Sequence, residues 1–340
     1  MKVMQMMAGA KYGGAEAFFT RLTIALQRAG LDQRIVIRED EDRARLLRAG
    51  GVEPIQLPFG GAFDFSTRWA IRRVIKEYSP DIVLTWMNRA TSMTPRGKFV
   101  HVGRLGGYYN IKYYRKCHHL IANTQDIVDY LRTNGWPDEK VHHLPNFVSS
   151  DHVAPVNRRK MYTPDTAPLV LALGRLHENK AFDTLLEAIA RVPNVYLWLA
   201  GEGPLRQQLE NRAEVLGIKP RVRFLGWRED VEALYATADI FVCPSRREPL
   251  GNVVIEAWAQ DIPVIAADSL GPGMLIRHGE SGILVPVDDA AALGRSIKHL
   301  AENPSLRDRL AEGGRAEYEA NYTENAVVDQ YLQFFSQIIR

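Results

Sequence analysis

The amino-acid sequence predicts an α/β protein made of two doubly wound parallel sheets. Short apolar segments alternate with longer amphipathic segments along the chain, which is typical of parallel strands covered by helices. This pattern occurs twice, and a polar, turn-rich stretch at 145–168 separates the two occurrences. A chain of 340 residues is also long enough for two domains. We therefore expect two Rossmann-like domains that face each other across a cleft, with ligands at the carboxyl ends of the strands.

The first half begins with KVMQMM, an expected strand, which leads into the expected helix AFFTRLTIALQRAG. Further strands are expected in QRIVIR, DIVLTW, KFVHVGRL, HLIANT and KVHHLPN. The segment STRWAIRRVIKEYSP places Trp69, Arg73 and Lys76 among apolar residues, which predicts a helix with a strongly basic side. We place this N-terminal domain at 1–152.

The second half restarts with the expected strand LVLALGRL and repeats the alternation as far as IPVIAAD. Between them lie FDTLLEAIARV, VYLWLAGEG, LRQQLENRAEVLG, RVRFLGW, DVEALYATA and DIFVCPS. These repeated strand–helix units predict another doubly wound sheet, and we place this C-terminal domain at 153–325. Three helical stretches close the chain.

Composition and charge narrow the class of protein. Hydrophobic residues make up 46% and charged residues 24%, as in soluble globular proteins. The apolar runs are far shorter than the roughly 20 residues that span a bilayer, and the start lacks the apolar core of a signal peptide. We therefore expect a cytoplasmic protein, with Cys117 and Cys243 reduced. Basic residues outnumber acidic ones in the front half. Such a face suits an anionic membrane surface or an acidic acceptor as a partner; in the alternative it is only a solvated surface. No nucleic-acid-binding module is recognisable.

Two carboxylates flank the start of an expected helix in the segment REPLGNVVIEAWAQ. Pro249 suits the first helical turn, and Gly251 permits a close approach of backbone or ligand. The N-terminus of a helix attracts a diphosphate or sugar hydroxyls, which the amides of Leu250, Gly251 and Asn252 would meet. Glu248 would then accept hydrogen bonds from vicinal hydroxyls, and Glu256 could hold both hydroxyls of a ribose. In the alternative, Glu248 only caps the helix and Glu256 is an ordinary exposed residue.

Two further patterns are compatible with phosphate binding. In GRLHENK, Gly174 and Arg175 end a strand and Lys180 precedes the next helix. A diphosphate leaving group needs such cations, although isolated basic residues are usually surface charges. The glycines Gly13 and Gly14 follow the first strand and permit a tight turn that faces a phosphate, but they do not form the dinucleotide fingerprint G-x-G-x-x-G.

The chain resembles the retaining glycosyltransferases of family 4, which have the GT-B fold, over nearly its whole length. The matching segments are GGAE, PNFV, GRLHENKAFDTLLEA, LAGEGPL, VRFLGW, ADIFVCPSRREPLGNVVIEAWAQDIPVIAAD and GESGILVPVDD. Glu248 and Glu256 form the E-x7-E motif of that family. The resemblance implies that Arg175 and Lys180 bind the phosphates of the donor, that Glu248 binds the transferred sugar, and that Glu256 binds the ribose.

The resemblance has further implications for the donor. It implies backbone contacts from Leu250, Gly251 and Asn252, and it places the loop of Gly226 and Trp227 near the base. It also implies that the last helix, near 326–340, crosses back onto the N-terminal domain. The co-substrate would be a UDP- or GDP-linked sugar, with no other cofactor and no metal.

One stretch departs from the family pattern. Many relatives carry a histidine after the strand that corresponds to HVGRL, where this chain has Gly106 or Gly107, and His101 is expected to lie inside the strand. Retention can proceed without a protein base if a phosphate oxygen of the donor accepts the proton. The tract is also a candidate acceptor site, because aromatic rings stack on sugars and cations pair with phosphate or carboxylate; its candidate residues are Arg104, Tyr108, Tyr109 and Lys112. In the alternative, the tract is a basic surface beside core tyrosines.

The sequence therefore predicts a retaining, metal-independent, hexosyltransferase-type enzyme of cell-surface polysaccharide or lipopolysaccharide synthesis. Its acceptor would be a saccharide or glycolipid at the inner face of the cytoplasmic membrane. Two alternatives remain open: a nucleotide-sugar 2-epimerase of the same architecture, and an inactive sugar-nucleotide or glycan-binding protein. A metal site at the histidine doublets is not expected, because neighbouring strand residues point to opposite faces.

Overall fold

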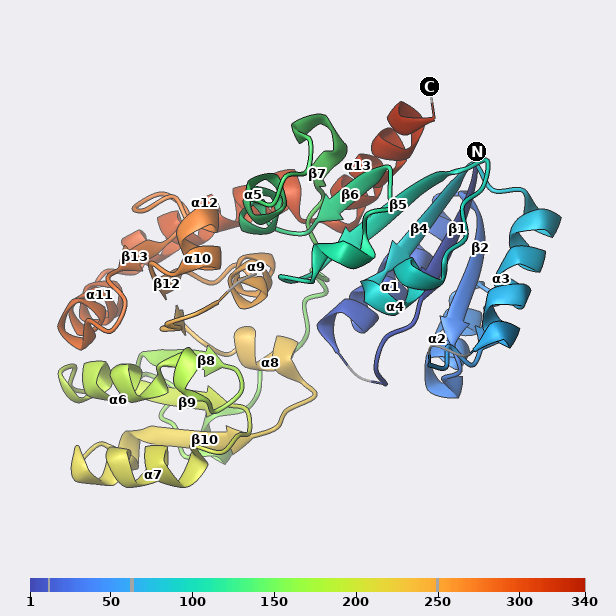
Figure 1. The fold of residues 1–340 in the computed structure, drawn as a ribbon. Helices are drawn as coiled ribbons and strands as arrows, with labels where there is room; N and C mark the ends of the chain where they lie inside the picture. Colours follow the sequence, from blue (N-terminus) through green and yellow to red (C-terminus); the bar gives the residue numbers. More distant parts are fainter. Residues whose placement is uncertain (12, 62–63, 249–250, 340) are drawn as a thin grey trace. The chain divides into compact units, whose positions relative to one another are not determined.

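The computed structural model describes residues 1–11, 13–61, 64–248 and 251–339, and it confirms the α/β class. The chain divides into two compact units, and each is built on one parallel sheet (Figure 1). Unit 1 comprises Met1–Phe147 and Glu324–Arg340, and unit 2 comprises Val148–Thr323.

The sheet of unit 1 has the strand order β3-β2-β1-β4-β5-β6-β7, and all of its paired strands are parallel. Its strands are β1 (Lys2–Met7), β2 (Asp32–Arg38), β3 (Ile55–Leu57), β4 (Ile82–Trp86), β5 (Val100–Leu105), β6 (His119–Ala122) and β7 (Val141–His143). The strand order reverses between β1 and β4. The carboxyl ends of strands at such a reversal are where open α/β sheets bind ligands.

Helices cover both faces of this sheet, because the strands are apolar on both sides. The helices are α1 (Gly14–Arg28), α2 (Glu41–Ala49), α3 (Phe65–Tyr78), α4 (Met87–Met93), η1 (Ile111–Tyr113), α5 (Gln125–Thr133), η2 (Asp138–Lys140) and α13 (Glu324–Ile338). In β1, Val3 and Met7 pack with α1, α2 and α13, whereas Met4 and Met6 pack with α3 and α4. The C-terminal helix α13 lies beside β6 and β7, where Phe334 contacts the ring of His142 (Figure 1).

The sheet of unit 2 has the order β10-β9-β8-β11-β12-β13 and is also parallel. Its strands are β8 (Leu169–Leu173), β9 (Tyr196–Ala200), β10 (Val222–Gly226), β11 (Ile240–Cys243), β12 (Val264–Ala267) and β13 (Ile283–Val285). Its order reverses between β8 and β11. Alternate residues of β8 enter two different cores: Val170 and Ala172 pack with α6, α7 and α11, and Leu169 and Leu171 pack with α8, α9 and α12.

The connections of unit 2 are helical. They are η3 (Arg158–Met161), η4 (Glu178–Lys180), α6 (Phe182–Ala190), α7 (Arg206–Val215), η5 (Lys219–Arg221), α8 (Val231–Tyr235), α9 (Asn252–Ala259), α10 (Leu270–Leu275), α11 (Ala290–Glu302) and α12 (Pro304–Asn321). Two of these elements, η4 and α9, position the charged residues of the candidate site.

Candidate functional site

The candidate site of unit 2 lies where its strand order reverses. The strands β8 and β11 are neighbours, so the segments that follow them leave the same edge of the sheet. The segment after β8 carries Gly174, Arg175 and Lys180, and the segment after β11 carries Glu248. The fold thus brings together residues that the sequence places about 70 positions apart.

Lys180 and Glu248 meet directly. The ammonium group of Lys180, at the end of η4, forms an ion pair with Oε2 of Glu248. Only 11% of the Glu248 side chain is exposed, and a carboxylate that is so nearly buried needs a compensating cation. Gly174 makes room for this contact: a Cβ at this position would lie 3.2 Å from Cε of Lys180, and its φ of +146° disfavours any side chain.

Arg246 holds the segment that carries Glu248. Its guanidinium donates to both carboxylate oxygens of Asp183, at 3.1 and 2.8 Å, and forms an ion pair with Asp288 at 2.7 Å. It also donates to the carbonyl oxygen of Glu178 at 2.7 Å. Burial raises the pKa of Asp183, but hydrogen bonds and charge from Arg246 outweigh it and hold that pKa below its ordinary value. Sequence reasoning missed this residue, although its place directly ahead of the acidic motif was a signal.

Helix α9 places Glu256 beside Tyr235. Gly251 caps the helix with a φ of +64°, and a Cβ there would lie 2.7 Å from the side chain of Leu275, so other residues are disfavoured at this position. The hydroxyl of Tyr235 shares its one hydrogen between the carbonyl oxygen of Val253, at 3.0 Å, and Oε2 of Glu256, at 3.3 Å. Burial, followed by the charge of Glu256, raises the pKa of Tyr235 well above its ordinary value. The tyrosine therefore remains a donor that orients the carboxylate.

The remaining residues predicted for the donor are less enclosed. Arg175 is exposed and forms no ion pair within the part of the chain that the structure describes. Trp227 is 76% exposed and follows Gly226, whose φ is +71°. Asn252 is the first residue of α9. Leu250, which was predicted to contribute an amide, lies outside the described residues, as does Pro249.

The loops after β8 and β9 touch through their backbones. The amide of Gly174 donates to the carbonyl oxygen of Ala200, at the end of β9, at 3.0 Å. The amide of Gly201 donates to the carbonyl oxygen of Gly226, at the end of β10, at 2.8 Å. A Cβ on Gly201 would lie 1.9 Å from the carbonyl oxygen of Gly174. This packing leaves no space for a side chain, and it fixes the loop that presents Arg175.

In unit 1 the glycine turn closes around a carboxylate. Glu16, in the first turn of α1, is buried and accepts a hydrogen bond from the amide of Ala10 at 2.8 Å. A Cβ on Gly9 or Gly13 would lie 2.4 or 2.3 Å from the oxygens of this carboxylate, whereas Gly14 faces open space. The inner side of the turn is therefore filled by a side chain of the protein itself. The sequence did not indicate this role for Glu16.

Arg104, one of the residues predicted to bind the acceptor, is buried inside unit 1. Arg104 is only 2% exposed; its guanidinium donates to the hydroxyl of Tyr331 at 2.8 Å and to Oδ1 of Asn146 at 2.6 Å. It also lies 4.3 Å from the ring centroid of Trp86, so its polar and cationic groups are used inside unit 1.

The aromatic members of the predicted acceptor tract lie nearer the surface. Tyr108 is half exposed and packs edge-on against Tyr130 at 5.3 Å. Burial raises the pKa of the partly buried Tyr109. The exposed Lys112 lies 5.0 Å from the ring of Tyr113. His101 lies inside β5, as expected; it is buried, and its Nε2 is 3.1 Å from Oγ1 of Thr85.

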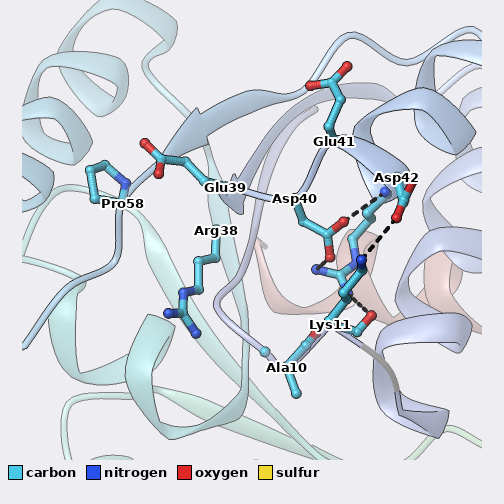
Figure 2. Close-up of a pocket in the computed structure, with 10 residues that line it drawn as sticks. Ala10, Lys11, Arg38, Glu39, Asp40, Glu41, Asp42 and Pro58 are labelled. Carbon is cyan, nitrogen blue, oxygen red and sulfur yellow. Dashed lines mark hydrogen bonds and ion pairs between the residues drawn. The ribbon is translucent and has the colours of Figure 1, made fainter.

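Unit 1 also contains a cavity of about 500 Å³ at the carboxyl ends of β1 and β2 (Figure 2). Its lining residues are Gly9, Ala10, Lys11, Arg38, Glu39, Asp40, Glu41, Asp42, Arg43 and Pro58. Arg43 closes one wall: it pairs with Asp40 at 3.2 Å and donates to the carbonyl oxygen of Ala10 at 2.8 Å. Figure 2 shows the guanidinium of Arg38 extending away from Asp40. No pattern in the sequence had indicated this charged cavity.

In the described ranges, no group of three or more His, Cys, Asp or Glu side chains could hold a metal ion. No helix in those same ranges is long and apolar enough to cross a membrane.

Known proteins match both units. The family model described as Glycosyltransferase Family 4 matches residues 12–152, and the model described as Glycosyl transferases group 1 matches residues 154–317. The crystal structure of HepE from Anabaena in complex with UDP superposes with a TM-score of 0.83 at 21% identity, covering 99% of this chain and 100% of the other. The fold and these matches define a glycosyltransferase of the GT-B class.

Two curated relatives from Rhizobium meliloti match over almost the whole length. The lipopolysaccharide core biosynthesis glycosyltransferase LpsE is 37% identical, with 96% of each chain covered. The lipopolysaccharide core biosynthesis glycosyltransferase LpsD is 34% identical, with 99% of this chain and 98% of the relative covered. The chain belongs to the family 4 glycosyltransferases, and the predictions of that family and of glycosyltransferase activity are confirmed.

Proposed function

We propose that the protein transfers a sugar from a UDP- or GDP-linked donor to a saccharide or glycolipid acceptor, with retention of the anomeric configuration and without a metal ion. The observation that carries the proposal is the ion pair of Lys180 with Glu248, at the edge of the sheet where β8 and β11 end. The similar fold of HepE, solved with UDP, supports a uridine nucleotide as the first donor to test.

In this proposal unit 2 binds the donor. Arg175 and Lys180 neutralise the charge that develops on the diphosphate as it leaves, which is the role that a metal ion has in other transferases. Glu248 accepts hydrogen bonds from the sugar hydroxyls, and Glu256 accepts those of the ribose. Backbone groups of Gly174, Gly251 and Asn252 complete the phosphate site, and the exposed Trp227, with Gly226, borders the base; Leu250 keeps its predicted role as an amide donor.

The reaction needs no protein base. The bond between the anomeric carbon and the phosphate oxygen breaks, and its electron pair leaves with the nucleoside diphosphate. The acceptor hydroxyl attacks the same face, and its proton passes to a phosphate oxygen of the leaving group. Protein groups that stabilise this phosphate therefore lower the barrier, which agrees with an uncharged glycine at the place of the family histidine.

Unit 1 is proposed to bind the acceptor. Tyr108, Tyr109 and Lys112 offer aromatic surface and a cation. Gly13 and Gly14, at the start of α1, keep their predicted role in binding the donor. Arg104 would act from behind this surface, because its guanidinium is buried. The relatives named for lipopolysaccharide core biosynthesis support a core oligosaccharide on its lipid anchor as the acceptor. Such an acceptor places the enzyme at the inner face of the cytoplasmic membrane, as a peripheral protein.

A transfer assay tests this function. The purified chain is incubated in EDTA with UDP- and GDP-hexoses, and with lipopolysaccharide of truncated core as the acceptor. We expect release of the nucleoside diphosphate that depends on the acceptor, and a product with the anomeric configuration of the donor. Inversion of that configuration, or a strict need for a divalent cation, would contradict the proposed mechanism. Conversion of the donor at C2 without any acceptor would indicate an epimerase instead, and binding of the donor without turnover would indicate an inactive binding protein.

A further inference from the structure

Helix α3 exposes two large aromatic side chains. Phe65 is 70% exposed and Trp69 is 64% exposed, whereas large aromatic side chains in folded proteins are mostly buried. The two residues are four positions apart, so they lie on one face of the helix. Figure 1 shows α3 beside β2 in unit 1. This face therefore presents apolar surface to water.

The orientation of α3 is fixed by the core of unit 1. The helix begins after Asp64, whose carboxylate accepts a hydrogen bond from the amide of Thr67 at 2.9 Å. Ile71 and Tyr78 are buried and pack in the same core as Met4. Because these contacts use the opposite side of the helix, Phe65 and Trp69 cannot turn inward without breaking the core.

Basic side chains continue the exposed face toward the end of α3. Arg72 and Lys76 come seven and eleven residues after Phe65, which places them on the same side of a helix. Both are exposed, and neither forms an ion pair with a described residue. Glu77, the acidic residue of this helix, is paired with Arg73 at 2.7 Å. We call Phe65, Trp69, Arg72 and Lys76 the α3 stripe.

We propose that the α3 stripe docks the enzyme on an anionic lipid surface. Aromatic rings favour the level of the lipid headgroups, and exposed Arg and Lys are attracted to anionic lipids. The unpaired positive charge of the stripe favours this partner over an uncharged apolar one. The proposal extends the proposed function, because a glycolipid acceptor would lie in the same membrane. Binding to vesicles needs neither donor nor acceptor, so failure of one proposal is distinguishable from failure of the other.

Not every exposed apolar residue has this setting. Leu46 on α2 is also exposed, but the adjacent Arg45 is paired with Asp42 at 3.0 Å. An apolar side chain among paired charges of both signs is common on protein surfaces. Leu46 therefore serves as a control for the loss of an exposed apolar group.

Sedimentation with vesicles tests the proposal. The full chain is mixed, at low ionic strength, with vesicles of phosphatidylcholine and phosphatidylglycerol in equal parts, or of phosphatidylcholine alone. We expect binding to the mixed vesicles only. Each basic residue near an anionic surface strengthens partitioning about fivefold, so the double substitution Arg72→Gln, Lys76→Gln should weaken it about 25-fold. The double substitution Phe65→Ser, Trp69→Ser should weaken it about tenfold or more, because the rings lose their apolar contact with lipid.

Two control variants test whether the loss of any exposed apolar group or of any two basic residues weakens binding. Leu46→Ser removes an exposed apolar group of unit 1, and Arg295→Gln with Lys298→Gln removes two charges from the exposed side of α11 in unit 2. Both controls should bind the mixed vesicles like the natural chain. The proposal is overturned if the natural chain does not bind the mixed vesicles, if it binds both kinds equally, or if the stripe variants bind as well as the controls. Transfer to a soluble acceptor should be the same in the stripe variants and the natural chain.

Discussion

The ammonium group of Lys180 and the carboxylate of Glu248 form an ion pair across 68 positions of the chain. Both side chains are mostly buried, so each reduces the cost of desolvating the other. A donor diphosphate would offer Lys180 a second anion, and the hydroxyls of the sugar would offer Glu248 new hydrogen-bond donors. The pair therefore keeps two charged groups in position before the donor arrives.

Removal of the cation should impair transfer far more than stability. We expect Lys180→Ala to lower kcat/KM by about 100-fold or more, because a preorganised cation at the leaving phosphate is lost. Steady-state kinetics measure this loss, and thermal unfolding checks that the variant is folded. Lys298→Ala, on the exposed side of α11, is the matched control and should keep full activity. A Lys180→Ala variant as active as this control would show that the residue does not serve the leaving phosphate.

The pair should also act as a unit. If Lys180 and Glu248 depend on each other, the double variant Lys180→Ala, Glu248→Ala should lose less activity than the product of the two single losses. Independent, multiplicative losses in this double-mutant cycle would contradict the coupling.

Arg246 should affect catalysis through Glu248. The Asp183 and Asp288 side chains that pair with it are about half exposed, so Arg246→Gln should lower the free energy of unfolding by only about 1 kcal/mol. Turnover should fall more than tenfold, because a small displacement of the segment that bears Glu248 misplaces the sugar. Urea unfolding and kinetics on the same preparation measure both effects. A large loss of stability with unchanged turnover would mean that Arg246 serves the fold alone.

Unit 1 should lose stability in mild acid. Burial, and then the neighbouring His118 and Lys116, lower the pKa of His101 from 6.5 to about 3. Between these values the unfolded chain takes up a proton that the folded chain refuses, so the stability present at neutral pH is lost as the pH falls below about 6.5. The free energy of unfolding should drop by about 2 kcal/mol between pH 7 and 5 from this residue.

Urea unfolding at pH 7 and at pH 5 measures this dependence. His101→Gln should flatten it, although His142, whose pKa burial lowers to about 4, should keep part of it. His299→Gln, on the exposed side of α11, is the control. If His101→Gln left the pH dependence of the free energy of unfolding unchanged, His101 would not be its source.

The central strands and the family motifs could be recognised in the sequence, and for the strands the reason is physical. Strands such as β1 and β8 are buried on both faces and therefore appear as continuous apolar runs. By contrast, β3 and β13, with three residues each, were not predicted. Length alone does not account for this, because β7 is equally short and was expected within KVHHLPN.

The roles of several charged residues depend on contacts that no local pattern reports. Arg104 appeared to be part of a basic, aromatic surface, yet its partner Tyr331 lies 227 positions away. The two carboxylates that hold Arg246 are likewise distant in sequence. The structural role of Glu16 was missed because the neighbouring glycines suggested a turn that binds an external phosphate. In the structure the turn surrounds the carboxylate of Glu16 itself.

Calorimetric titration tests most directly whether unit 2 contains a nucleoside diphosphate site that includes Glu256. UDP and GDP are titrated, in EDTA, into the natural chain, into Glu256→Ala, and into Glu302→Ala on the exposed side of α11. A hydrogen bond to a charged group contributes about 1.5–3 kcal/mol. We therefore predict that one of the two nucleotides binds the natural chain and Glu302→Ala equally, and binds Glu256→Ala at least about tenfold more weakly. Binding that Glu256→Ala leaves unchanged, or no binding of either nucleotide to the natural chain, would contradict the account.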